Sequence, residues 1–218
     1  MKNRPIKYLL VLVLLWVSCQ SCFQFRESDK KQLKTLSEIA TKYEVQLGKK
    51  RAIDRDIHYT YVHSDTTRPL AIFVHGSPGS SSSFIHFAHD TGLLSRYNVL
   101  LLDRPGFGYS DFGQSEPSIQ RQAEILNAIV EQFSSTKKIL IGHSLGGPII
   151  ANMAMKMPEA YAGLLIVAGS VSPELEPQEK WRKPMNSPLL RWILPRSFRV
   201  SNQEILPAKE ELLAMEND

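Results

Sequence analysis

Short, unbroken runs of hydrophobic residues recur along the middle of the chain. They cover residues 70–74, 99–102, 139–141 and 164–168. A run that is apolar at every position is typical of a strand covered on both faces. Stretches of helical character lie between the runs, at residues 83–95, 119–133 and 145–157. This alternation predicts an α/β fold, a mostly parallel sheet flanked by helices, with a site at the carboxyl ends of the strands.

The region before the first run carries two other patterns. Across residues 28–50 the apolar positions are spaced close to 3.6 residues apart, which predicts a single amphipathic helix. These positions are Leu33, Leu36, Ile39, Ala40, Tyr43 and Leu47. Residues 57–62 alternate in character instead, as expected of an edge or half-buried strand, and a polar turn follows at residues 63–68.

Residues 1–22 have the pattern of an export signal, with a basic start, an apolar run at 8–17 and then small and polar residues. The apolar run is too short to span a bilayer, and a buried N-terminal helix is the alternative. Both cysteines, Cys19 and Cys22, follow this run, so a disulfide scaffold is excluded. The segment resembles a bacterial lipoprotein signal in which Cys19 takes a lipid. We expect an exported, cell-envelope protein that is either lipid-anchored or secreted.

The length and charge of the chain limit the classes of function that it can have. With 218 residues, of which 43% are hydrophobic, one main domain is expected. The chain has 26 basic and 22 acidic residues, and three of the basic residues fall in the first 18, which hold no acid, so 23 face 22 in the remainder. This balance gives no reason to expect nucleic-acid binding. No cluster has metal-ligand spacing, and we expect neither a metal nor a cofactor.

The strongest chemical signal is the sequence Gly142-His143-Ser144-Leu145-Gly146. It lies directly between a predicted strand and a predicted helix, which is the setting of a nucleophile on a sharp strand-to-helix turn. Such a turn strains the serine backbone, and glycines two residues before and after it let strand and helix approach each other. Unpaired N–H groups at the start of the helix would point toward an oxyanion formed there.

Two further motifs follow strands. One is His75-Gly76-Ser77-Pro78-Gly79, and the other is Asp103-Arg104-Pro105-Gly106-Phe107-Gly108-Tyr109-Ser110. With the serine motif, and in this order, they resemble the α/β-hydrolase family over residues 57–172.

The resemblance implies roles for particular residues. Ser144 is the expected nucleophile, and the backbone N–H groups of Ser77 and Leu145 the expected oxyanion hole, supported by His75, Gly76, Gly142, His143 and Gly146. His75 and Asp103 are structural in most members. Relatives that cleave carbon–halogen bonds or epoxides carry aspartate at the nucleophile position. Serine therefore indicates acyl transfer from a small, ester-like substrate through an acyl-enzyme.

A serine nucleophile needs a base, and the family takes an acid and then a histidine from loops after two further strands. All six histidines precede Ser144: His58, His63, His75, His86, His89 and His143. On the turn His143 should point away from Ser144 into packing near the strand, and His75 is only a slightly better base. Glu174 or Glu176 is a remote candidate for the acid. We expect a C-terminally incomplete and nearly inactive hydrolase.

Residues 173–218 resemble the start of a helical cap. Prolines divide them into short pieces, of which 189–194 and 208–215 are expected to be helical. The stretch 180–199 is basic and aromatic without an acid, so it is either a membrane-facing or anion-binding segment or a solvated cap face. The resulting division is signal 1–22, helical segment 23–50, core 51–172 and cap 173–218.

Two other interpretations remain open. The chain is a non-catalytic, hydrolase-like binding protein, or a second chain completes its triad. In the leading hypothesis the strand at 164–168 is an uncovered sheet edge, which predicts poor solubility. Esterase, lipase, thioesterase and peptidase activities all fit the motifs.

Overall fold

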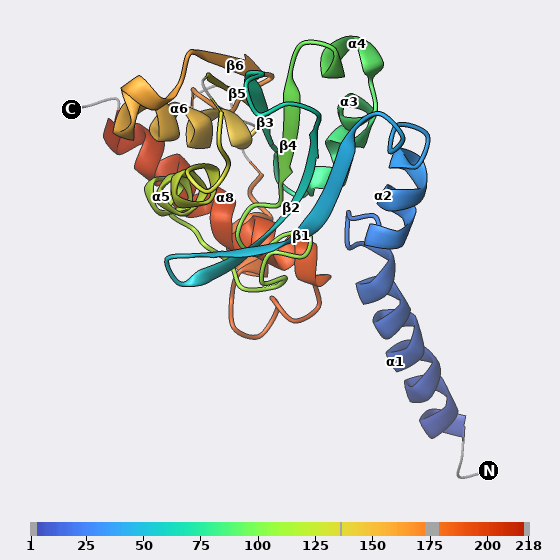
Figure 1. Ribbon diagram of the computed structural model, residues 1–218. Helices are drawn as coiled ribbons and strands as arrows, with labels where there is room; N and C mark the ends of the chain where they lie inside the picture. Colours follow the sequence, from blue (N-terminus) through green and yellow to red (C-terminus); the bar gives the residue numbers. More distant parts are fainter. Residues whose placement is uncertain (1–3, 136, 173–178, 216–218) are drawn as a thin grey trace.

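The computed structural model describes residues 4–135, 137–172 and 179–215 (Figure 1). A six-stranded sheet with the order β1-β2-β4-β3-β5-β6 forms its centre. The strands are β1 (Glu44–Ala52), β2 (Arg55–His63), β3 (Leu70–Val74), β4 (Asn98–Leu102), β5 (Lys138–His143) and β6 (Gly163–Val167). Strands β4, β3, β5 and β6 are parallel, whereas β1 and β2 form an antiparallel hairpin that pairs antiparallel with β4. The predicted α/β class with a mostly parallel sheet is confirmed.

Helices cover both faces of the sheet, and a separate hydrophobic cluster fills each side. Helices α5 (Ile119–Val130) and α6 (Gly146–Lys156) lie on one face, close to where they were predicted. Helix α2 (Asp29–Leu36) and the short elements η1 (Ser81–Phe84), α3 (Ile85–Ala88) and α4 (Thr91–Leu94) lie on the other (Figure 1). A short turn, η2 (Pro158–Ala160), precedes β6.

The single helix predicted over residues 28–50 is wrong. Helix α2 ends at Leu36, and β1 begins at Glu44 and pairs with β2 along its whole length. The apolar spacing misled because Leu36, Ile39 and Tyr43 do pack into one cluster, while Leu47 also fits the two-residue period of a strand.

Two other elements differ from expectation. Strand β2 is interior because β1 covers its outer edge, so its central residues are buried and it is not an edge strand. The helix predicted over residues 83–95 is broken between Ala88 and Thr91. There the side chain of Asp90 accepts a hydrogen bond from the Leu93 N–H at 2.7 Å and begins a new helix.

The segment after the sheet contains one long helix. Helix α7 (Arg182–Met185) is short, but α8 (Arg196–Met215) has 20 residues and continues through Pro207. Of the helical turns expected at 189–194 and 208–215, the first forms turns that no helix follows until Arg196, and the second is part of the longer α8. The expected break before residue 208 was wrong, because a proline removes one helical hydrogen bond without ending a helix that is packed on the core. Glu174 and Glu176 lie outside the described residues.

Helix α1 (Arg4–Cys22) projects from the body of the molecule (Figure 1). Its apolar residues from Leu9 to Val17 are exposed on every side. Within the part of the chain that the structure describes, no helix is both long and apolar enough to cross a membrane. The side chains of Cys19 and Cys22 lie outside the described residues.

Candidate active site

Ser144 lies at the junction of β5 and α6, at the carboxyl end of the sheet. Its backbone has a φ of +51°, a left-handed conformation that residues other than glycine rarely adopt. Backbone hydrogen bonds on both sides hold this turn: the Ser144 N–H donates to the Val167 carbonyl at 3.0 Å, and the Gly147 N–H donates to the Ser144 carbonyl at 2.8 Å. The strained residue is therefore fixed by its surroundings.

The two glycines of the motif are required because neighbouring backbone atoms leave no room for a side chain. A Cβ atom on Gly142 would lie inside van der Waals contact with the Gly146 carbonyl, and one on Gly146 would collide with the Val74 carbonyl. Strand β5, helix α6 and the end of β3 thus approach too closely for any side chain. The predicted reason for the G-x-S-x-G spacing is confirmed at both positions.

The loop after β3 reaches the same place. A Cβ atom on Gly76 would lie 2.8 Å from the Cβ of Ser144, so the loop backbone packs directly against the serine. Ser77, Ser144 and Leu145 line one cavity. Among the described residues, the backbone N–H groups of Ser77 and Leu145 have no acceptor. The structure brings together the three residues predicted for the nucleophile and the oxyanion hole.

The cavity above Ser144 has a volume of about 590 Å³. Its base is formed by the serine turn, and α8 and the segment around α7 form its walls. The apolar lining residues are Leu145, Ile205, Leu206, Ala208, Leu212 and Leu213, and the charged ones are Glu179, Lys180, Arg182, Lys183, Lys209 and Glu210. Within residues 4–135, 137–172 and 179–215 no group of three or more metal-ligating side chains could hold an ion.

His75 has a structural environment. It is buried, its Nδ1 donates to the Gly76 carbonyl at 2.7 Å, and its Nε2 accepts from the Arg104 N–H at 3.0 Å. Burial, together with the positive charge of Arg104, lowers the pKa of His75 to about 3. The imidazole is therefore neutral and occupied at both nitrogens, so it orders the loop and cannot serve as a base.

Asp103 orders the second loop. Its carboxylate accepts hydrogen bonds from the Ser81 N–H at 2.6 Å, the Tyr109 N–H at 2.9 Å and His58 Nδ1 at 3.0 Å. Burial alone would raise the pKa of Asp103, but the hydrogen bond from His58 and the neighbouring donors lower it. Gly108 is also necessary, because a Cβ there would overlap this carboxylate.

A buried ion pair that no sequence pattern indicated joins the core to helix α8. The guanidinium of Arg104 contacts the carboxylate of Glu204 on α8, and it also donates to Gln122 Oε1 at 2.8 Å and to the Gly76 carbonyl at 3.1 Å. Gln122 Nε2 in turn donates to Glu204 Oε1 at 2.7 Å. Both charged side chains are fully buried. The loop that carries Ser77 is thus tied to the helix above the cavity.

His143 differs from its predicted environment. Its side chain is exposed and lies beside the loop after β3, where a Cβ atom on Gly76 would be 3.2 Å from His143 Nδ1. Among the described residues that line the cavity there is no histidine. Among the described residues, the cavity lining therefore offers no imidazole to Ser144.

A mostly parallel sheet with a serine on a strained strand-to-helix turn, beside two free N–H groups, defines the architecture of an α/β hydrolase. Residues 69–193, more than half of the chain, match the family model described as the alpha/beta hydrolase fold. The chain belongs to this family, whose members are hydrolases.

Curated relatives match parts of the chain. A proline iminopeptidase of Saccharolobus solfataricus is 32% identical over 130 residues, covering 57% of this chain and 41% of that protein. A 2-hydroxy-6-oxononadienedioate/2-hydroxy-6-oxononatrienedioate hydrolase of Escherichia coli is 32% identical over 101 residues, covering 45% and 35%. The chain thus spans less than half the length of these relatives, and their different substrates do not select one for it.

Solved structures share the fold. A membrane phospholipase A superposes with a TM-score of 0.54 at 22% identity, covering 96% of this chain and 75% of that one. A haloalkane dehalogenase from Agrobacterium tumefaciens has a TM-score of 0.55 at 18% identity, covering 77% and 68%. At these identities the likeness extends to the fold alone.

Proposed function

We propose that the protein is a serine hydrolase that cleaves ester-like small molecules through an acyl-enzyme on Ser144, and that it is exported to the cell envelope. The observation that carries the proposal is the left-handed backbone of Ser144, held at the base of a cavity that Ser77 and Leu145 also line. Strain of this kind is concentrated at functional sites.

The proposed reaction uses these groups in sequence. Ser144 Oγ bonds to the substrate carbonyl carbon while its proton passes to a base, and the carbonyl oxygen takes the negative charge. The N–H groups of Ser77 and Leu145 stabilise that oxygen. The alcohol then departs with a proton, and water hydrolyses the resulting ester on Ser144. We propose that this reaction occurs in the cell envelope, to which the export signal at residues 1–22 directs the chain and at which a lipid on Cys19 anchors it.

The base is proposed to come from outside the described residues. The cavity lining described above contains no histidine, and His75 is occupied at both nitrogens. An oxyanion hole and a binding cavity without the base retain roughly 10³-fold acceleration over water. We therefore expect the 218-residue chain to hydrolyse simple esters far more slowly than a family member with a complete triad.

A fluorophosphonate probe tests the nucleophile, because it phosphorylates an activated serine covalently. We expect a single adduct on Ser144, mapped by peptide mass spectrometry, that disappears in Ser144→Ala. Ser170→Ala is the matched control, since Ser170 lines the same cavity and should leave labelling unchanged. Labelling is expected to be slow for the 218-residue chain and fast for the protein isolated from its native source.

The second candidate function is binding without catalysis, which the absence of a histidine from the described cavity lining favours. Absence of any Ser144 adduct, in the native protein as well as in this chain, would support that function and overturn the proposed one. The intact mass of the native protein accompanies the labelling. A mass several kilodaltons above the 24.7 kDa of this sequence would show that the native protein has an additional segment, and that segment would be the proposed source of the base.

A further inference from the structure

The segment before α8 presents large apolar side chains to solvent. Leu189 is 88% exposed, and Trp192 and Ile193 are more than half exposed. We call residues 189–199 the cap apex. None of them lines the Ser144 cavity. Exposing three large apolar side chains within five residues to water is unfavourable in free energy, so we expect this surface to bind an apolar partner.

Arginines surround these side chains. Arg199 lies 4.6 Å and Arg191 5.4 Å from the Trp192 ring centroid, and Arg196 is exposed beside them. Burial and the positive charges of Arg196 and Arg191 lower the pKa of Arg199. The sequence from residue 180 to residue 203 contains no acid that could balance this charge. The cap apex therefore combines apolar and cationic surface.

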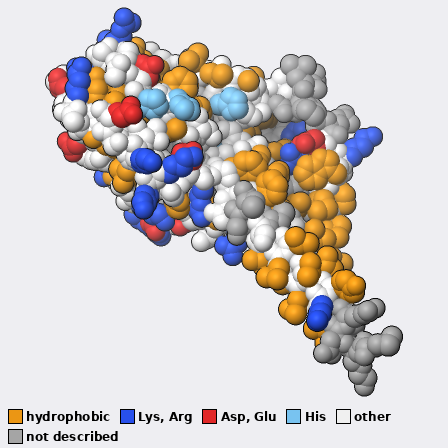
Figure 2. All heavy atoms as spheres, turned by 90° about the vertical axis from the view of Figure 1, so that its right-hand side faces the viewer, with side chains coloured by type: hydrophobic (Ala, Val, Ile, Leu, Met, Phe, Trp, Pro, Cys, Tyr) orange, Lys and Arg blue, Asp and Glu red, His pale blue; other side chains and the backbone are white. Residues whose placement is uncertain are grey.

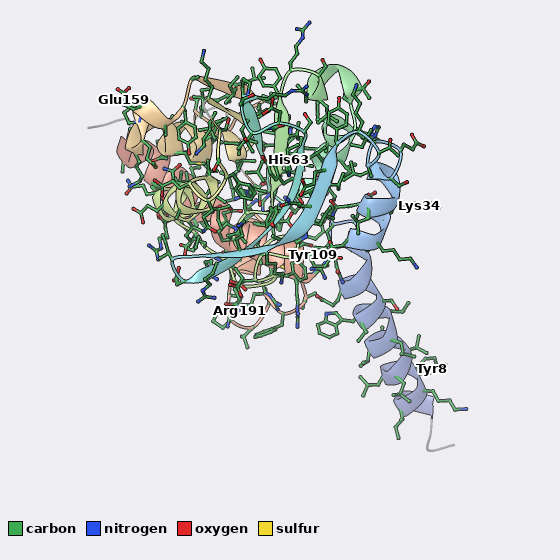
Figure 3. The ribbon with its side chains drawn as sticks, viewed as in Figure 1. Tyr8, Lys34, His63, Tyr109, Glu159 and Arg191 are labelled. Atoms are coloured by element: carbon green, nitrogen blue, oxygen red, sulfur yellow. The ribbon has the colours of Figure 1, made fainter. Side chains whose placement is uncertain are left out.

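The cap apex adjoins the base of the projecting helix α1. The Arg196 N–H donates to Gln20 Oε1 at 3.0 Å, and Gln20 Nε2 donates to the Leu194 carbonyl at 3.3 Å. Phe23 and Phe25 pack edge-on against Phe198. Figure 3 shows Arg191 at the side of the body from which α1 projects toward Tyr8. Figure 2 shows hydrophobic side chains covering α1 and continuing onto the adjoining part of the body.

We propose that the cap apex docks onto the surface of an anionic lipid bilayer, with Leu189, Trp192 and Ile193 inserted among the lipids. Tryptophan and aliphatic side chains partition into the headgroup region, and arginines pair with anionic headgroups there. The apolar surface of α1 meets the same bilayer for as long as the export signal is retained. Pairing with a second copy is disfavoured, because two-fold symmetry would bring two arginine clusters together.

A photoreactive residue tests this contact directly. The full chain is prepared with p-benzoylphenylalanine in place of Ile193 and incorporated into vesicles that contain phosphatidylglycerol. We expect covalent lipid adducts on illumination. The matched control carries the same residue in place of Met155, which is 74% exposed on α6, and it should give adducts at least tenfold less often.

Charge provides the second comparison. Arg191→Gln together with Arg196→Gln should reduce lipid adducts at position 193 by roughly 25-fold, since each basic residue at an anionic surface contributes about a fivefold change in binding. Arg96→Gln with Lys137→Gln removes the same charge at the amino ends of strands β4 and β5 and should leave the yield unchanged. Vesicles of phosphatidylcholine alone should also give a low yield.

Two outcomes would overturn the proposal. Equal lipid adducts at positions 155 and 193 would mean that α1 alone attaches the chain, with no defined contact of the cap apex. Crosslinks from position 193 to a second copy would identify a protein interface instead. Neither outcome depends on Ser144 reacting with a fluorophosphonate, so this inference and the proposed function can fail separately.

Discussion

At the scale of single residues, the serine turn depends on the absence of side chains at two positions. Gly146 is the more constrained, because a Cβ atom there would meet the carbonyl oxygen at the end of β3 and that backbone cannot move without disturbing the sheet. We expect Gly146→Ala to lower the free energy of unfolding by about 3 kcal/mol and to abolish fluorophosphonate labelling.

A second glycine provides the control. A Cβ on Gly163 would find its nearest neighbour at 3.7 Å, which is ordinary contact. Gly163→Ala should change the free energy of unfolding by less than about 1 kcal/mol. Denaturant unfolding of both variants makes the comparison, and equal effects would show that the tight approach at Gly146 is not what holds the turn.

At the scale of elements, α8 is the feature that the sequence concealed. Its inward face carries Glu204 and Glu211, and the latter accepts hydrogen bonds from the Ile119 and Gln120 N–H groups at the start of α5, at 2.8 and 2.9 Å. In a search for hydrophobic periodicity, glutamates count as surface positions, so the inward face of α8 could not be recognised from the sequence. The strands and the serine turn were predictable because their patterns are local.

The ion pair between α8 and the core gives the second prediction. Glu204→Gln leaves the buried Arg104 without a charged partner, and we expect the free energy of unfolding to fall by about 3 kcal/mol. Glu210→Gln, at an exposed position of the same helix, should have an effect below about 0.5 kcal/mol. Chemical denaturation measures both, and a small effect at Glu204 would contradict a paired charge.

At the scale of the whole molecule, β6 is the edge of the sheet within the described residues, and it presents apolar side chains. Such an edge is a template for association between chains. We expect Leu165→Lys, at a side chain that is 54% exposed, to reduce self-association measured by sedimentation velocity. Met155→Lys adds the same charge on α6 and should leave association nearly unchanged. Equal effects would locate the association elsewhere, as on α1.

The sequence could anticipate the sheet and the serine turn, because each depends on neighbours along the chain, whereas Ser77 and Leu145 were expected beside Ser144 from the resemblance to the α/β-hydrolase family. The patterns along the chain could not anticipate where long-range partners meet. The exposure of His143 depends on which elements pack around the serine turn, and the course of residues 37–52 depends on the pairing of β1 with β2. Such information resides in the tertiary arrangement and not in a periodicity.

The two glutamates of α8 also determine how a molecule could reach Ser144. They lie seven residues apart, about 10 Å along the helix. Glu204 contacts Arg104 and accepts from Gln122, and Glu211 accepts from the N–H groups at the start of α5. A helix held at two such points is a fixed cover over the cavity, since moving it outward would break both attachments together. Lys180 and Lys183 are exposed and line the cavity beside α7, so a substrate that entered there would leave both attachments intact.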